Sequence, residues 1–231
     1  MPDVDRPRVI LASASPRRRE LLRAIVPPQQ TLVRPAAGFV EPPCPVGASV
    51  AEVARFVEEL AAAKAAAAAA ELTAADAGAL VLAADTLVVF EDGGHAVPLG
   101  KPPEDSPGYE QTVCETLRRL SDRSHHVVSG VCVISEDPGS GRESGQPSPP
   151  RTEHGFDVST SVQTTVTFGQ ISDAAAAAYA ATGEPRGKAG GYAIQGIGAA
   201  FVRRVEGSLS NVIGLPVEET RRLLSDAGLA A

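Results

Sequence analysis

The sequence predicts a single mixed α/β domain that spans residues 1–231. A first observation is a set of apolar runs typical of buried strands, at residues 9–12, 80–90, 127–134 and 158–168. A second is a set of helical patterns between these runs, at residues 16–26, 49–77, 110–120 and 173–182. The third is a hydrophobic content of 43%, enough at this length for one sizeable core. One domain is therefore favoured over two small ones.

Charge and composition exclude several classes of protein. A net charge of −7 and a pI near 5.2 argue against a protein that coats nucleic acid, because such binding needs a broad basic face. Three widely spaced cysteines without a Cys-x-x-Cys pair indicate a reducing compartment and no structural zinc. The N-terminus lacks an apolar signal region, and outside alanine-rich helix no stretch of about 18 apolar residues occurs. We expect a soluble cytoplasmic protein that binds neither nucleic acid nor membrane.

The first strand runs directly into a helix at a turn suited to an anion. Ser15 is a candidate N-cap, and a proline fits the first helical position, so the helix is predicted to begin at Pro16. Arg17, Arg18 and Arg19 then crowd the first turn, where the helix dipole disfavours cations. A phosphate chain would accept hydrogen bonds from the free amides and the guanidinium groups. Three solvated arginines without a ligand explain this stretch alone equally well.

The next segments contain two charged residues that have ordinary explanations. A short strand is predicted at residues 31–33, followed by a proline-bounded loop that contains Glu41, by itself an ordinary exposed carboxylate. Ser49 and Glu52 form a capping box at the start of the alanine-rich helix. Lys64 is the only charge in the alanine run at residues 61–70, where a surface lysine would serve solubility.

The apolar strand at residues 80–90 is interrupted by Asp85 and Thr86. An ionised carboxylate in such a strand is costly unless it is paired, hydrogen-bonded or bound to a metal. The alternative is a strand-end aspartate capped by its own threonine and backbone. A hairpin turn follows at residues 91–94, and Lys101 then lies in a Gly-Lys-Pro turn, where the flanking residues restrain the backbone.

The second half of the chain contains a long polar insertion and a glycine-rich loop. Residues 136–156 are rich in Gly, Ser, Pro and charge and predict a disordered hairpin loop between two strands. His125 lacks acidic or cysteine partners at ligand spacing, which favours a structural role. The loop with Glu184, Lys188 and Gln195 is not a phosphate-binding P-loop, because its glycine spacing is too short and Ala189 replaces the Mg²⁺-binding hydroxyl. Its glycines still permit close backbone approach to a ligand.

Six segments, taken together and in order, resemble the Maf family of nucleoside triphosphate pyrophosphatases, named for septum formation. Residues 13–22 read Ser-Ala-Ser-Pro-Arg-Arg-Arg-Glu-Leu-Leu, and residues 60–65 read Leu-Ala-Ala-Ala-Lys-Ala. The others are the Asp-Thr pair of the apolar strand, the Gly-Lys-Pro turn, residues 120–131, and the glycine-rich run at 182–196 with 207–216. The sequence departs from the family pattern at Asp122, Ser129 and Gln163, where glycine, threonine and an acidic residue are usual.

The resemblance implies a fold, a reaction and a set of site residues. The fold would be a twisted central sheet with flanking helices and a deep cleft, as in Maf and ITPase-like proteins, and homodimerisation is compatible with it. The reaction would be Mg²⁺- or Mn²⁺-dependent hydrolysis of a nucleoside triphosphate to the monophosphate and pyrophosphate. Asp85 and Glu41 would hold the metal, with Asp85 as the base. Substrate phosphates would contact Ser13, Arg17, Arg18, Lys64, Lys101 and Lys188.

Three positions that separate subgroups of the family predict the substrate. Members that act on dTTP and UTP carry the residues found here as Arg17, Thr86 and Gln195. A glutamine amide presents a donor and an acceptor together to the edge of uracil or thymine. We therefore expect dTTP, UTP and modified pyrimidine triphosphates as substrates. Two alternatives remain: a nucleotide-sensing regulator of cell division that acts through a partner, and an α/β domain whose polar residues are only caps.

Overall fold

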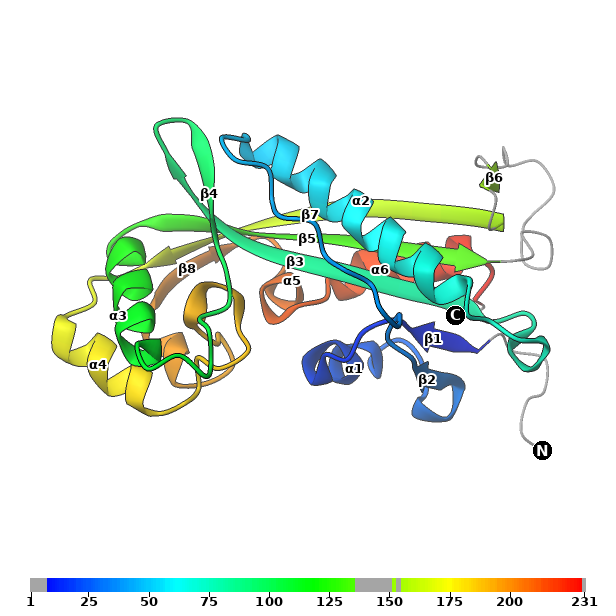
Figure 1. Ribbon diagram of the computed structural model, residues 1–231, viewed down its shortest axis with the longest axis horizontal. Coiled ribbons are helices and arrows are strands. Elements are labelled where there is room, and N and C mark those ends of the chain that lie inside the picture. Colours follow the sequence, from blue (N-terminus) through cyan, green and yellow to red (C-terminus); the bar gives the residue numbers. More distant parts are fainter. Residues whose placement is uncertain (1–7, 136–150, 153–154, 230–231) are drawn as a thin grey trace.

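The computed structural model describes residues 8–135, 151–152 and 155–229 and contains one mixed, eight-stranded sheet (Figure 1). The strands follow the order β2-β1-β3-β5-β7-β6, while β4 pairs with β3 and β8 pairs with β7. Their bounds are β1 Val9–Leu11, β2 Thr31–Val33, β3 Leu80–Asp92, β4 His95–Leu99, β5 Ser124–Ser135, β6 Arg151–Thr152, β7 Gly155–Phe168 and β8 Val202–Glu206. Strand β1 runs parallel to β2 and β3, and the other pairs are antiparallel. The prediction of a single mixed α/β domain is confirmed.

Helices lie at both ends of the sheet and on both of its faces (Figure 1). They are α1 Pro16–Leu22, α2 Val50–Ala69, α3 Tyr109–Leu120, α4 Asp173–Ala181, α5 Leu209–Ile213 and α6 Val217–Asp226, with 3₁₀ turns η1 Pro28–Gln30, η2 Ala74–Asp76, η3 Ala189–Gly191 and η4 Ile197–Phe201. The predicted start at Pro16 and the Ser49–Glu52 capping box are confirmed. Helix α2 ends at Ala69, before the predicted residue 77, because Thr73 and Asp76 cap a separate 3₁₀ turn.

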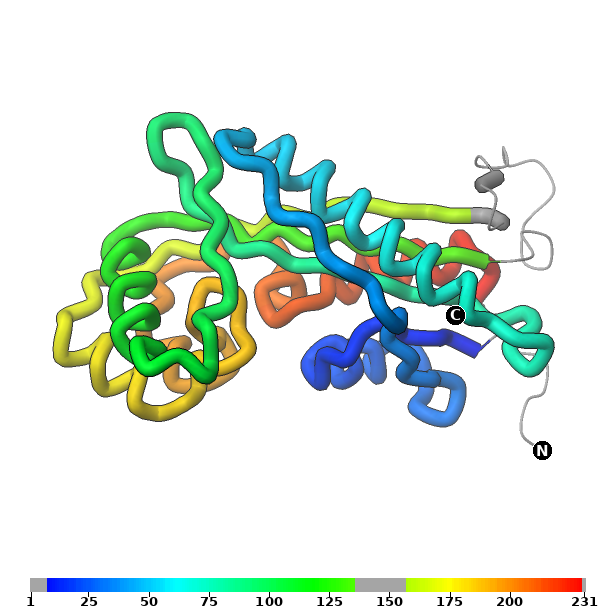
Figure 2. The backbone as a smooth tube through the Cα atoms, viewed as in Figure 1, coloured from blue at the N-terminus to red at the C-terminus, as the bar shows by residue number. Residues whose placement is uncertain are grey.

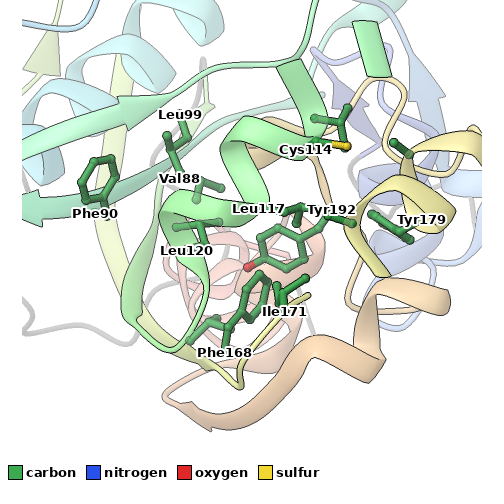
Figure 3. Packing of buried hydrophobic residues seen from close by; sticks show 14 of the residues in the cluster. Val88, Phe90, Leu99, Cys114, Leu117, Leu120, Phe168, Ile171, Tyr179 and Tyr192 are labelled. Carbon is green, nitrogen blue, oxygen red and sulfur yellow. The ribbon is translucent and has the colours of Figure 1, made fainter. Parts of the chain in front are cut away.

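Two hydrophobic clusters lie at opposite ends of the long strands β3 and β5. One is built from α3, α4 and the adjoining ends of the strands, with Leu117, Leu120, Phe168 and Tyr192 at its centre (Figure 3). The other joins β1, α1 and α6 to the sheet, for example through Leu11. The molecule thus has two lobes that share the same strands, which is the arrangement expected of a fold with a cleft between lobes.

Helix α2 lies across one face of the sheet, and residues 34–49 run alongside it (Figure 2). The amide of Ala37 donates to the Glu71 carboxylate over 2.8 Å, and Cys44 packs near the first turns of the helix. This extended segment brings Glu41 to Lys64, in the C-terminal half of α2. The position of Glu41 is therefore set by a long run without helix or strand.

One further expectation concerns a segment at the edge of the described residues. The predicted hairpin loop at 136–156 falls largely outside them, and its described parts are β6 and the start of β7, which begins at Gly155 rather than the predicted residue 158. Within the residues that the structure describes, no helix is long and apolar enough to cross a membrane.

Candidate active site

A cavity of about 650 Å³ lies between the two lobes and brings together every site residue that the sequence predicts. Those residues come from segments far apart in the sequence, from the β1–α1 turn to the loop between η3 and η4. They are Ser13, Arg17, Arg18, Glu41, Lys64, Asp85, Thr86, Lys101, Lys188 and Gln195. Five cations and two carboxylates thus face one space, which is the composition expected of a site for a polyanion with a bound cation.

Arg18 links the β1–α1 turn to strand β3 and to the residue that follows α5. Its guanidinium donates to Ser13 Oγ over 3.2 Å, to Thr86 Oγ1 over 3.1 Å and to the carbonyl oxygen of Gly214 over 3.0 Å. Burial lowers the pKa of Arg18, while Asp85 acts in the opposite direction. Because an arginine stays charged under such shifts, Arg18 places a fixed positive charge at the start of α1.

Arg17 and Arg19 differ although they are neighbours on α1. Arg17 lines the cavity and donates from Nη2 to the carbonyl oxygen of Gly187 over 3.3 Å, so it links α1 to the loop of the other lobe. Partial burial lowers its pKa. Arg19 is exposed and does not line the cavity. Two of the three arginines in the first turn are therefore available to an anion in this space.

Lys64 bridges the two predicted metal-binding carboxylates. Its ammonium donates to Asp85 Oδ1 over 2.6 Å and also to Glu41 Oε1. The side chains of Lys64 and Asp85 are only 12% and 9% exposed, whereas that of Glu41 is 60% exposed. Partial burial acts to raise the pKa of Glu41, but the hydrogen bond from Lys64 and the nearby Lys101 and Arg18 hold that pKa below its ordinary value. Glu41 and Lys64, each ordinary in the sequence, thus belong to one charged cluster with Asp85.

The three remaining site residues predicted from the sequence have different environments. Lys101 is exposed and makes no hydrogen bond within the described residues. The ammonium of Lys188 donates to the backbone carbonyls of Glu184 and Arg186, so it is turned toward its own loop. Burial lowers the pKa of Lys188, and Arg17 adds to that effect. Gln195 is exposed at the cavity wall. Lys101 is thus the better presented of the two lysines.

The apolar walls of the cavity were not predicted from the sequence. They include Phe39, Leu87, Val88 and Ile194, and the ring of Phe39 lies 5.9 Å from the Lys64 ammonium. The segment with Phe39 has no helical or strand period, so nothing in its pattern indicated a place in the site. These apolar side chains supply surface for a nucleoside, which the charged residues do not.

Three polar residues discussed above lie outside the cavity lining. Glu184 accepts hydrogen bonds from the backbone amides of Ile197 and Gly198. His125 is completely buried, with Nε2 2.8 Å from the Tyr192 hydroxyl, and burial lowers its pKa to about 3. This is the environment of a structural histidine. Gln163 lies 3.1 Å from His126 Nδ1 and does not line the cavity, so it contributes no group to this site.

The donor set of the cavity fits a hard divalent cation bound together with phosphate. Among the described residues no three His, Cys, Asp and Glu side chains gather into a closed metal site. Asp85 and Glu41 do face the same space, on either side of Lys64. Mg²⁺ keeps several waters and binds proteins through one or two carboxylates plus substrate phosphates, so two carboxylates are a sufficient protein contribution.

Comparison with known proteins agrees with this geometry. The family model described as Maf-like protein matches residues 8–227. A protein of Paramagnetospirillum magneticum named dTTP/UTP pyrophosphatase is 43% identical over 224 residues, which cover 96% of this chain and 98% of the relative. Proteins with the same name are 41% identical in Anaeromyxobacter sp., covering 96% of this chain and 90% of the relative, and 38% identical in Deinococcus radiodurans, covering 100% and 98%. The chain therefore belongs to the family of Maf-like proteins.

Proposed function

We propose that this chain is a divalent-metal-dependent nucleoside triphosphate pyrophosphatase that hydrolyses dTTP and UTP to the nucleoside monophosphate and pyrophosphate. The observation that carries the proposal is the cavity between the lobes, where Lys64 links two carboxylates and four further cations face the same space. The names of the relatives point to the same reaction. A bound triphosphate would supply negative charge to balance these cations, which outnumber the carboxylates of the cavity.

In the proposed reaction, a water molecule attacks the α-phosphorus and the bond from that phosphorus to the bridging oxygen of the β-phosphate breaks. A carboxylate oxygen of Asp85 takes the proton of the water, and pyrophosphate leaves with the electron pair of the broken bond. Asp85 suits this role because it is held in place by the rigid strand β3 and by the Lys64 ammonium at 2.6 Å. Glu41, on a segment without helix or strand, is placed by Lys64.

The cations would bind the phosphates and stabilise the charge that develops on the leaving pyrophosphate. Arg17, Arg18 and Lys101 are the strongest candidates because each faces the cavity from a different position around it. Fixed cations of this kind commonly supply the largest single contribution to phosphoryl-transfer catalysis. Ser13 adds a hydroxyl beside Arg18. For Lys188 to join them, its ammonium must leave the two backbone carbonyls that it contacts in the structure.

Asp85 and Glu41 would hold a Mg²⁺ or Mn²⁺ ion together with the substrate phosphates. When bound, the ion would neutralise phosphate charge and polarise the phosphoryl group. The two carboxylates would then share their charge between the ion and the ammonium of Lys64. That arrangement makes Lys64 a group that orients both carboxylates as well as a candidate phosphate ligand.

We assign the recognition of the base chiefly to Gln195. Its amide is exposed at the cavity wall, where the donor and acceptor of a uracil or thymine edge can pair with it. The Thr86 hydroxyl contacts both Arg18, at 3.1 Å, and Ser129, at 2.8 Å. Thr86 would therefore act on selectivity by fixing Arg18 rather than by reaching the base.

A pyrophosphate-release assay with a panel of triphosphates tests this proposal. With Mg²⁺, we expect kcat/KM for dTTP and UTP to exceed the values for GTP, ATP and 7-methyl-GTP. A higher kcat/KM for 7-methyl-GTP would overturn the assignment to pyrimidine substrates and leave the pyrophosphatase proposal standing. Tight nucleotide binding without turnover would favour the nucleotide-sensing regulator instead. A homodimer, a role in cell division and a cytoplasmic location remain predictions.

A further inference from the structure

The loop that presents Gln195 is anchored on both sides by one network of hydrogen bonds. On the N-terminal side, the amide of Ala193 donates to the Tyr179 hydroxyl oxygen over 3.0 Å. On the C-terminal side, the amide of Ile197 donates to the Glu184 carboxylate over 2.8 Å. The Tyr179 hydroxyl itself donates to Glu184 over 2.9 Å. Each anchor thus lies two residues from Gln195, and the two anchors are bonded to each other.

The chain wraps closely around the Glu184 carboxylate. The amide of Gly198 donates a further hydrogen bond to it over 2.9 Å. A Cβ atom at Gly196 would lie 2.2 Å from Glu184 Oε2, and a Cβ atom at Gly198 would lie 2.8 Å from the Tyr179 hydroxyl oxygen. Glycine at both positions is therefore what lets the backbone enclose the carboxylate.

The network contacts the hydrophobic core of the lobe built from α3 and α4, and its side chains do not line the cavity. Tyr179, on α4, is 2% exposed and lies within the hydrophobic cluster of that lobe (Figure 3). Its ring packs edge-on against Phe201, with centroids 5.2 Å apart. Neither Tyr179 nor Glu184 lines the cavity, whereas Gln195 does. Neither residue is thus placed to contact a substrate in the cavity.

We propose that Tyr179 and Glu184 are positioning residues that set substrate selectivity by holding the loop from which Gln195 meets the nucleobase. This inference rests on the proposed function, because it takes Gln195 as the group that reads the base. An amide selects one base by pairing only if its donor and acceptor are held in a fixed orientation. A loose loop would let the same amide turn and pair with other bases, so discrimination would fall while the chemistry at Asp85 continued.

The test compares Tyr179→Phe and Glu184→Gln with the wild-type chain. The first removes one hydroxyl and keeps the ring, and the second replaces an acceptor oxygen with a donor that faces backbone amides. We expect both to lower the dTTP-to-GTP ratio of kcat/KM by about three- to tenfold, the effect of losing one or two hydrogen bonds. The kcat for dTTP should change by much less. Tyr109→Phe is the matched control, because its hydroxyl has no partner among the described residues.

A double variant shows whether the effect passes through Gln195. Tyr179→Phe combined with Gln195→Ala should give the same dTTP-to-GTP ratio as Gln195→Ala alone. An unchanged ratio in both single variants, or a further fall in the double variant, would overturn the positioning role. The same ratio measured as dissociation constants of non-hydrolysable dTTP and GTP analogues needs no turnover. Absence of hydrolysis would therefore contradict the proposed function without deciding the positioning role, which the binding ratio decides.

Discussion

Gly130 pairs directly with Asp85 across strands β5 and β3, and its missing side chain lets α2 lie against the sheet at this point. A Cβ atom at Gly130 would lie 2.0 Å from the carbonyl oxygen of Val57 on α2. Lys64 follows Val57 by seven residues, about two helical turns, and so lies on the same face of the helix. The close approach at Gly130 therefore sets the distance between α2 and the sheet, across which Lys64 reaches Asp85.

Gly130→Ala should push α2 away from the sheet, because the added methyl group meets backbone atoms that cannot rotate aside. We expect a loss of about 1–3 kcal/mol in the free energy of unfolding, as for other overpacked cores, together with a lower kcat. Urea unfolding and steady-state kinetics measure the two effects. Gly169→Ala is the control, since its methyl group would make only ordinary contacts, the nearest at 3.8 Å. Equal behaviour of the two variants would contradict the argument.

Asp85→Asn should fold normally and lose most of its turnover with little change in substrate affinity, because it removes the proposed base or metal ligand, which would act mainly in the transition state. A fall in kcat of about 10²- to 10⁴-fold is the usual effect of losing a general base. Asp92→Asn, at the exposed end of the same strand, should leave kcat unchanged. Near wild-type kcat in Asp85→Asn would refute the role of Asp85.

Arg17→Ala and Lys101→Ala should weaken both affinity and turnover, because under the proposed function each cation would contact phosphate in the ground state and in the transition state. We expect kcat/KM for dTTP to fall by at least about tenfold, the effect of one charge-assisted hydrogen bond. Arg19→Ala is the matched control, because Arg19 lies two residues away on α1, is exposed and does not line the cavity. If Arg17→Ala and Arg19→Ala had equal kcat/KM, the phosphate contacts assigned to Arg17 would be wrong.

His125 should make the protein less stable in acid. Burial holds its pKa at about 3, whereas an unfolded chain has a histidine pKa near 6.5. Between these values the unfolded chain binds a proton that the folded chain does not. The contribution of His125 to the free energy of unfolding is therefore fully present above about pH 6.5 and is lost as the pH decreases toward 3. The expected slope is up to about 1.4 kcal/mol per pH unit.

His125→Gln should flatten this dependence in urea unfolding between pH 6.5 and 4. Tyr192→Phe removes the hydrogen bond to His125 but leaves the ring buried, so it should lower stability by about 1 kcal/mol and keep most of the slope. Equal slopes in the wild-type chain and His125→Gln would show that another group causes the acid sensitivity.

Local features of this fold were predictable because their signals lie within a few residues of sequence. The Ser15 cap, the Ser49–Glu52 capping box and the apolar strand with Asp85 are of this kind, and each is present in the structure. The pattern Thr73-x-x-Asp76 was also visible and marked the turn after α2, where the predicted helix was too long.

Relations between distant segments could not be predicted from local pattern. The register that places Gly130 opposite Asp85 depends on the pairing of two whole strands. The turning of Lys188 toward carbonyls of its own loop depends on how that loop folds around Glu184. Phe39 reached the cavity through a segment with no periodic signal. The residue types of the site were thus readable from the sequence, but the contacts that orient them were not.

Identification of the products formed from dTTP tests the central claim most directly. The purified chain is incubated with dTTP and Mg²⁺, and the phosphorus-containing products are followed by ³¹P NMR, with Asp85→Asn run in parallel. The account predicts dTMP and pyrophosphate in equal amounts, formed much more slowly by Asp85→Asn. Formation of dTDP and inorganic phosphate, or the same rate in both proteins, would contradict cleavage between the α and β phosphates by a site built around Asp85.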